Sequence, residues 1–195
     1  MKKVLLLGDS IRMGYEAFVK ELLQDECEVY FSEDNGRFAA YTLWQANQMF
    51  KQYGHFDVVH WNNGYWDMNV KEPMEEAMHP LDEYRHFLER IIVQCRKNGA
   101  KIIFATTTPV PEKGSAFDVS HTGCYISYVN EWVRAYNRVA KDLMEKEHIP
   151  VNDLYALMQN GENYYKCPDK LHLTMEGNRL CAQQAAAMIR HVLAN

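Results

Sequence analysis

The sequence has no block of basic residues, no long apolar segment and no pair of cysteines at C-x-x-C spacing. It contains 21 Lys and Arg against 26 Asp and Glu, so its formal net charge is −5. An acidic chain without a basic patch is poorly suited to bind nucleic acid or an anionic membrane surface. No apolar run approaches the roughly 20 residues of a membrane-spanning helix. We therefore expect neither a nucleic-acid nor a membrane partner.

The cysteines are odd in number and scattered, at Cys27, Cys95, Cys124, Cys167 and Cys181. This distribution favours reduced thiols over a disulfide framework, and we expect a cytoplasmic protein. The apolar run at residues 4–7 is too short for a secretory signal, since Gly8 interrupts it at once.

Several catalytic motifs are also missing. The chain has no G-x-S-x-G, G-x-G-x-x-G or Walker A sequence, which disfavours an α/β-hydrolase elbow and a nucleotide-binding loop. Its eight histidines show neither H-x-H nor H-E-x-x-H spacing. We expect no metal and no cofactor.

What is present is an alternation of short apolar runs with helical patterns. The runs predict strands at 4–7, 27–31, 57–61, 101–105 and 149–151, with Glu28 placing the second at a sheet edge. The helical patterns lie at 15–23, 41–53, 81–97, 125–146 and 175–193, and residues 106–123 are expected to form a long loop. The order predicts one α/β domain over residues 1–195, a mainly parallel sheet between two helical layers.

Two short segments carry the chemistry. Ser10 follows the first expected strand through Gly8-Asp9, so its hydroxyl is expected at the carboxyl edge of the sheet, although Ser10 also fits a helix N-cap. Asp169 and His172 are separated by two residues, which lets both side chains approach one pocket. An acid that orients a His beside a Ser is the arrangement of serine hydrolases.

The segments VLLLGDS at 4–10 and DKLHLTMEG at 169–177 resemble the first and last blocks of the SGNH/GDSL hydrolases. The resemblance spans nearly the whole chain. It implies a flavodoxin-like three-layer α/β/α fold and an ester hydrolase with Ser10 as nucleophile, His172 as base and Asp169 as the orienting acid.

Two middle blocks of this family supply the oxyanion hole together with the Ser10 N–H. Gly36 fits the second block, although Asn35-Gly36 is also a plain turn sequence. The third block is usually Gly-x-Asn-Asp, but Trp66 stands here at the Asn position. A variant of this block has Asn two positions before the Gly, and the segment NNGYWD at 62–67 is similar to it. We expect Asn62 to be the amide donor, with Asn63 as the alternative. A third possibility is that both are turn residues and that only backbone N–H groups bind the oxyanion.

The resemblance to this variant favours a carbohydrate O-acetylesterase acting on a small-molecule or oligosaccharide ester. Aromatic residues expected near the mouth suit sugar rings, although aromatics are more often core: Trp44, Trp61, Tyr65, Trp66 and Tyr125. Asn63 and Trp66 are the expected substrate-binding residues. A lipid or thioester hydrolase, and a non-catalytic glycan-binding protein on the same fold, are the alternatives, and the sequence leaves the oligomeric state open.

Overall fold

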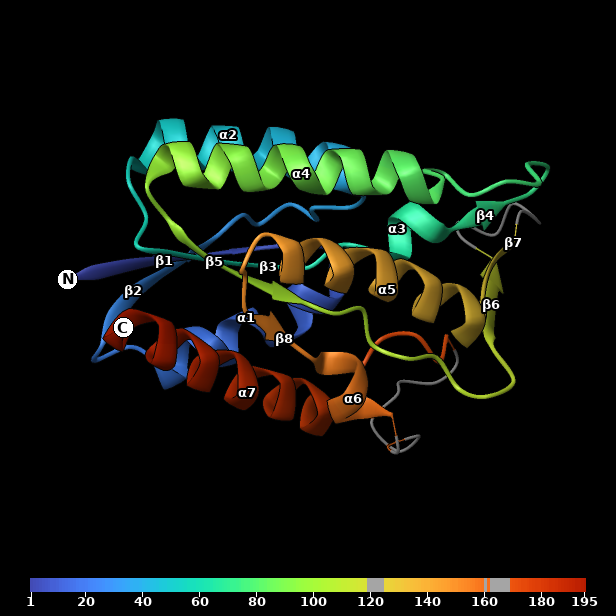
Figure 1. The fold of residues 1–195 in the computed structure, drawn as a ribbon. Coiled ribbons are helices and arrows are strands. Elements are labelled where there is room, and N and C mark those ends of the chain that lie inside the picture. Colours follow the sequence, from blue (N-terminus) through green and yellow to red (C-terminus); the bar gives the residue numbers. More distant parts are fainter. Residues whose placement is uncertain (119–124, 160, 162–168) are drawn as a thin grey trace.

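A computed structural model describes residues 1–118, 125–159, 161 and 169–195. At its centre is a five-stranded sheet in the order β2-β1-β3-β5-β8 (Figure 1). All neighbouring strands are parallel. The strands are β1 (Lys2–Leu7), β2 (Cys27–Phe31), β3 (Val58–Trp61), β5 (Lys101–Ala105) and β8 (Val151–Asn152). When these five strands are numbered without those of the smaller sheet, their order is 2-1-3-4-5, the order of flavodoxin-like sheets, as expected.

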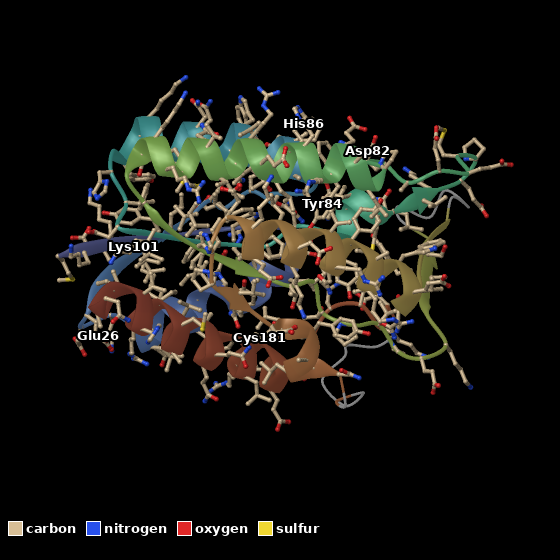
Figure 2. All side chains as sticks on the ribbon, in the orientation of Figure 1. Glu26, Asp82, Tyr84, His86, Lys101 and Cys181 are labelled. Carbon is tan, nitrogen blue, oxygen red and sulfur yellow. The ribbon has the colours of Figure 1, made fainter. Side chains whose placement is uncertain are left out.

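Helices cover both faces of this sheet (Figure 1). One face carries α1 (Ser10–Leu22) and α7 (Met175–Ala194), and the other carries α2 (Ala39–Tyr53), α4 (Leu81–Asn98) and α5 (Asn130–Lys146). Strands between two helical layers have no solvent face, which explains why residues 4–7 are all apolar and fully buried. The helices are amphipathic instead: Tyr84 of α4 is buried, whereas His86 two residues later is exposed (Figure 2).

A small antiparallel sheet was not expected from the sequence. It has the order β4-β7-β6 and consists of β4 (Val70–Lys71), β6 (Ser115–Asp118) and β7 (Tyr125–Tyr128). The long loop expected at 106–123 therefore contains a strand, and the helix expected from residue 125 begins only at Asn130. Residues 125–128 pair with two other segments, and such tertiary pairing overrides a local helical pattern.

The remaining elements agree with the sequence prediction to within a few residues, and β2 is an edge strand as predicted. The main shift is at α1, which begins at Ser10 instead of residue 15. Two short helices, α3 (Tyr65–Met68) and α6 (Leu154–Met158), complete the described elements. None of the described helices is long and apolar enough to cross a bilayer.

The described cysteines, Cys27, Cys95 and Cys181, are free and buried. Cys124 and Cys167 lie outside the described residues.

Candidate active site

Ser10 stands at the sharp turn between β1 and α1. Asp9, not Ser10, caps the helix, because its side chain accepts a hydrogen bond of 2.9 Å from the Ile11 amide. Ser10 is thus the first residue of α1, and its N–H has no acceptor within the helix. Gly8 makes the turn possible: its φ is 142°, and a Cβ there would lie 2.1 Å from the side-chain oxygen of Asn62.

The structure brings Ser10, His172 and Asp169 together from opposite ends of the chain. The Ser10 Oγ lies 2.7 Å from His172 Nε2, and His172 Nδ1 lies 2.8 Å from Asp169 Oδ2. A carboxylate beside Nδ1 holds the proton there, which leaves Nε2 to accept the proton of the Ser10 hydroxyl. This is the geometry of an activated serine nucleophile.

The turn that carries Asp169 and His172 is held by its own backbone. Asp169 Oδ1 accepts hydrogen bonds from the amides of Leu171 (3.0 Å) and His172 (3.2 Å), while Lys170 has a φ of 50°. Partial burial acts to raise the pKa of Asp169, but the His172 ring and these two amides outweigh it and hold that pKa below its usual value. Asp169 is therefore ionised wherever it is needed to orient the imidazole.

A residue outside the site expected from the sequence also supports this turn. The hydroxyl of Ser115, in β6, donates to the backbone carbonyl of Asp169. The two residues are 54 positions apart, so no local pattern could have revealed the contact.

Gly36 lies against the nucleophile turn, as expected for an oxyanion-hole residue, but its amide has another partner. Its N–H donates to the Gly8 carbonyl at 2.8 Å, and a Cβ on Gly36 would lie 2.4 Å from that oxygen. The turn reading is also present, since Asn35 Oδ1 accepts from the Arg37 amide at 2.8 Å. The close packing explains why a glycine is required here, and the oxyanion role of its N–H stays a prediction.

The two candidate asparagines differ in how their amide groups are used. Asn62 Nδ2 has one partner among the described residues, Asp9 Oδ1 at 3.2 Å. Asn63 Nδ2 donates both to the Arg37 carbonyl (3.1 Å) and to Thr42 Oγ1 (2.9 Å). An amide nitrogen carries two N–H groups, so Asn62 has one left for a ligand and Asn63 has none.

Asn63 braces the segment that follows Gly36 through its bond to the Arg37 carbonyl. Both side chains are buried, Asn62 at 1% and Asn63 at 0% exposure, so their hydrogen-bond partners distinguish them and their burial does not. A substrate contact by Asn63 stays a prediction. Trp66 is partly exposed and remains a candidate.

Of the other aromatics expected near the mouth, Trp61 and Tyr65 belong to the core, and the side chain of Tyr125 lies outside the description. Trp44 is 55% exposed, on α2.

The acidic residue of the third block, Asp67, has a structural role. Its Oδ1 accepts from the Ala39 amide at the start of α2 (2.8 Å) and lies 2.8 Å from His79 Nδ1. Burial raises the pKa of Asp67, opposed by these hydrogen bonds. The buried carboxylate of Asp67 thus connects the third block to the start of α2 and to the segment before α4.

Asp9 gives a test of the electrostatics beside Ser10. Burial raises its pKa from 3.8 to about 6, against the hydrogen bonds from Ile11 and Asn62. Because the folded state binds the Asp9 proton more tightly than the unfolded state, this group's contribution to stability falls as the pH rises from about 4 to about 6. Asp9→Asn keeps an oxygen that can cap α1 and removes the buried charge.

We therefore expect Asp9→Asn to raise the free energy of unfolding above pH 6 by up to about 3 kcal/mol, with little difference near pH 4. Urea unfolding of the native protein and the variant, near pH 4 and near pH 8, measures the effect. A variant that is less stable than the native protein near pH 8 would contradict this account of Asp9.

No group of three or more potential metal ligands occurs among the residues that the structure describes.

Comparison with known proteins agrees with this geometry. The sequence profile of the GDSL-like Lipase/Acylhydrolase family matches residues 6–180. Comparison with the curated proteins finds no match. Among solved structures, TesA has a TM-score of 0.74 at 15% identity, covering 98% of this chain and 99% of that one.

Two further structures are similar over their full length. A carbohydrate esterase family 3 protein from Talaromyces cellulolyticus has a TM-score of 0.73 at 15% identity, with 100% of both chains covered. Est24, a carbohydrate acetylesterase from Sinorhizobium meliloti, has a TM-score of 0.73 at 12% identity, covering 98% of this chain and 100% of that one. At these identities the likeness establishes the fold, and the profile match establishes that the chain belongs to the GDSL-like lipase/acylhydrolase family of carboxylic ester hydrolases.

Proposed function

We propose that this protein is a serine esterase that removes a short acyl group, expected to be acetyl, from a carbohydrate. The observation that carries the catalytic part is the hydrogen-bonded series Ser10–His172–Asp169, at 2.7 and 2.8 Å. His172 takes the Ser10 proton as the oxygen attacks the ester carbonyl, and it then protonates the leaving alcohol. Water repeats these steps on the acyl-enzyme and releases the acid.

The tetrahedral oxyanion needs donors that are already in place. The N–H of Ser10 at the start of α1 is the first, and the second N–H of the Asn62 amide is the next. Gly36 is the third, provided that its N–H leaves the Gly8 carbonyl when the oxyanion forms.

The carbohydrate part of the proposal has separate support. Two of the similar structures are described as a carbohydrate esterase and a carbohydrate acetylesterase. The partly exposed Trp66 offers a flat face on which a sugar ring can stack. We also propose that residues 1–195 form one catalytic domain around their shared core, and that the protein is cytoplasmic, in agreement with the free thiols of Cys27, Cys95 and Cys181.

We expect kcat/KM for p-nitrophenyl esters to be highest with acetate and to decline by butyrate, because Asn62 places a polar amide beside the turn that carries Ser10. Steady-state kinetics over a series of acyl lengths measures this preference, and a panel of acetylated sugars tests the alcohol. An optimum at octanoate or longer would place the protein among lipid hydrolases and refute the proposal for acetyl groups.

Trp66→Ala separates the sugar from the acyl group. If Trp66 stacks on a sugar ring, its loss raises KM for acetylated sugars and leaves p-nitrophenyl acetate unchanged. A serine-reactive phosphonate distinguishes the esterase from a glycan-binding protein, since only an active hydrolase is labelled at Ser10.

A further inference from the structure

Arg12 is the second residue after the nucleophile, and its side chain is completely buried, at 0% exposure. An arginine remains charged in proteins, so burying one is unfavourable unless its N–H groups and charge find partners. The charge is paired with Glu16, one turn further along α1. The other contacts of the guanidinium among the described residues are with backbone carbonyls, which accept hydrogen bonds from its remaining N–H groups.

These carbonyls belong to two segments. Arg12 Nη1 donates to Ser32 at 2.9 Å and Nη2 donates to Asp34 at 3.0 Å, both in the loop between β2 and α2. Nε and Nη2 also donate to Gly8 at 3.4 and 3.3 Å. One rigid fork thus connects the turn before Ser10 to the loop that carries Gly36.

Other buried side chains hold this loop, here called the β2–α2 loop (residues 32–38). Gln45 Nε2 donates to the Asp34 carbonyl at 3.0 Å, and Thr42 Oγ1 donates to the Gly36 carbonyl at 2.9 Å. Asn63 Nδ2 donates to the Arg37 carbonyl at 3.1 Å. Arg12 differs from these three because it also contacts the Gly8 carbonyl, the acceptor that Gly36 now uses.

The Gly8 carbonyl therefore has two sets of donors. Gly36 N–H is close, at 2.8 Å, while the Arg12 contacts of 3.3 and 3.4 Å are long. If the Gly36 N–H turned to an oxyanion with no replacement, a buried carbonyl would lose its main hydrogen bond, which is unfavourable. Arg12 is already aimed at that oxygen and needs only to shorten an existing contact.

We propose that Arg12 is a positioning residue for the oxyanion hole. It fixes the β2–α2 loop through Ser32 and Asp34, and it satisfies the Gly8 carbonyl when the Gly36 N–H turns to the developing oxyanion. The inference rests on the proposed esterase function, and specifically on Gly36 as an oxyanion donor. A lysine is a poor substitute, because an ammonium lacks the planar fork that reaches three carbonyls together.

The test compares Arg12→Lys and Arg12→Ala with the native protein on p-nitrophenyl acetate. We expect Arg12→Ala to lower kcat by about 10²-fold, the size of one lost oxyanion donor, with KM changed less than about threefold. Arg12→Lys should lose most of the same activity. Millimolar guanidinium should restore part of the kcat of Arg12→Ala, since the free ion can occupy the vacated space and donate to the same carbonyls.

Arg190→Ala is the matched control. Arg190 lies on α7 and also pairs with a carboxylate, that of Glu26. It donates to a backbone carbonyl as well, that of Leu22 at 2.8 Å, at the end of α1 far from Ser10. Unlike Arg12, it is exposed. Its loss should leave kcat unchanged, with no response to guanidinium.

A kcat within twofold of native in folded Arg12→Lys or Arg12→Ala would overturn the proposal. So would a loss of kcat that guanidinium does not restore and that matches a fall in the fraction of folded protein. Ser10→Ala tests the proposed function separately. If Ser10→Ala remains active, the esterase mechanism is wrong. If Ser10→Ala is inactive and the Arg12 variants are fully active, only the role of Arg12 is rejected.

Discussion

Ser10→Ala and His172→Ala are each expected to lower kcat by about 10³-fold or more, because members of a triad act as one unit. The reason lies in the single series of hydrogen bonds from Ser10 Oγ through the imidazole to Asp169. Without the hydroxyl no acyl-enzyme forms, and without the imidazole the hydroxyl keeps its proton. Burst and steady-state kinetics with p-nitrophenyl acetate measure both losses.

The double variant tests whether the residues cooperate. We expect Ser10→Ala/His172→Ala to be little worse than either single variant, whereas independent residues would show multiplied losses. Asp169→Asn should fold, since an amide oxygen can still accept from the Leu171 amide, yet it should lose much of kcat because it no longer holds the required tautomer. Near-native kcat in Asp169→Asn would show that another group orients His172.

Asn62→Ala is expected to produce the second-largest effect, a loss of about 10²–10³ in kcat with little change in KM. Asn62 follows β3 and reaches the nucleophile turn through Asp9, with one amide N–H not engaged by the described residues. Removing it deletes one donor to the oxyanion, a charge that develops in the transition state and is absent from the bound ester. Steady-state kinetics of the variant, with its melting temperature as a check on folding, measure this effect.

Two controls distinguish catalysis from folding. Asn98→Ala removes an asparagine with a structural role. Its side chain binds the backbone of Phe56 and Gly54 at the amino-terminal end of the sheet, so its loss should lower stability and leave kcat unchanged. Trp66→Asn should not rescue Asn62→Ala, because a side chain two residues past Gly64 need not aim at the same point. If Asn62→Ala keeps kcat within a few-fold and Asn63→Ala does not, Asn63 is the amide donor. If neither variant affects kcat, the oxyanion hole is built from backbone N–H groups alone.

The sequence by itself predicted the central sheet and indicated the candidate triad, and the two predictions have different grounds. Strands buried on both faces are largely apolar, so the apolar runs at residues 4–7 and 102–105 predicted two strands of the central sheet. The nucleophile and its base lie in short segments that end or precede regular elements, and parallel strands bring such segments to one edge. Asp169 and His172 are separated by two residues, so their spacing predicted that both reach one pocket, and the resemblance of the two segments to the family's first and last blocks assigned their roles.

Local pattern failed where the decisive partner is distant in the sequence. Residues 125–128 form β7 because β4 and β6 pair with them, and the segment alone does not specify this pairing. The sequence could not decide between Asn62 and Asn63, since adjacent asparagines have equal local propensities. Tertiary contacts separate them, because Arg37 and Thr42 occupy both N–H groups of Asn63.

Only the tertiary structure assigned Ser10 to the first helical position and Asp9 to the cap, and only it showed that Gly36 and Arg12 share the Gly8 carbonyl. Each of these facts concerns which donor meets which acceptor inside a packed site. Hydrophobic periodicity records the face that a residue presents, and it carries no information about hydrogen-bond partners 20 or more positions away. The sequence therefore determined the reaction class and indicated the nucleophile that we propose, while packing decided which donors and acceptors surround Ser10.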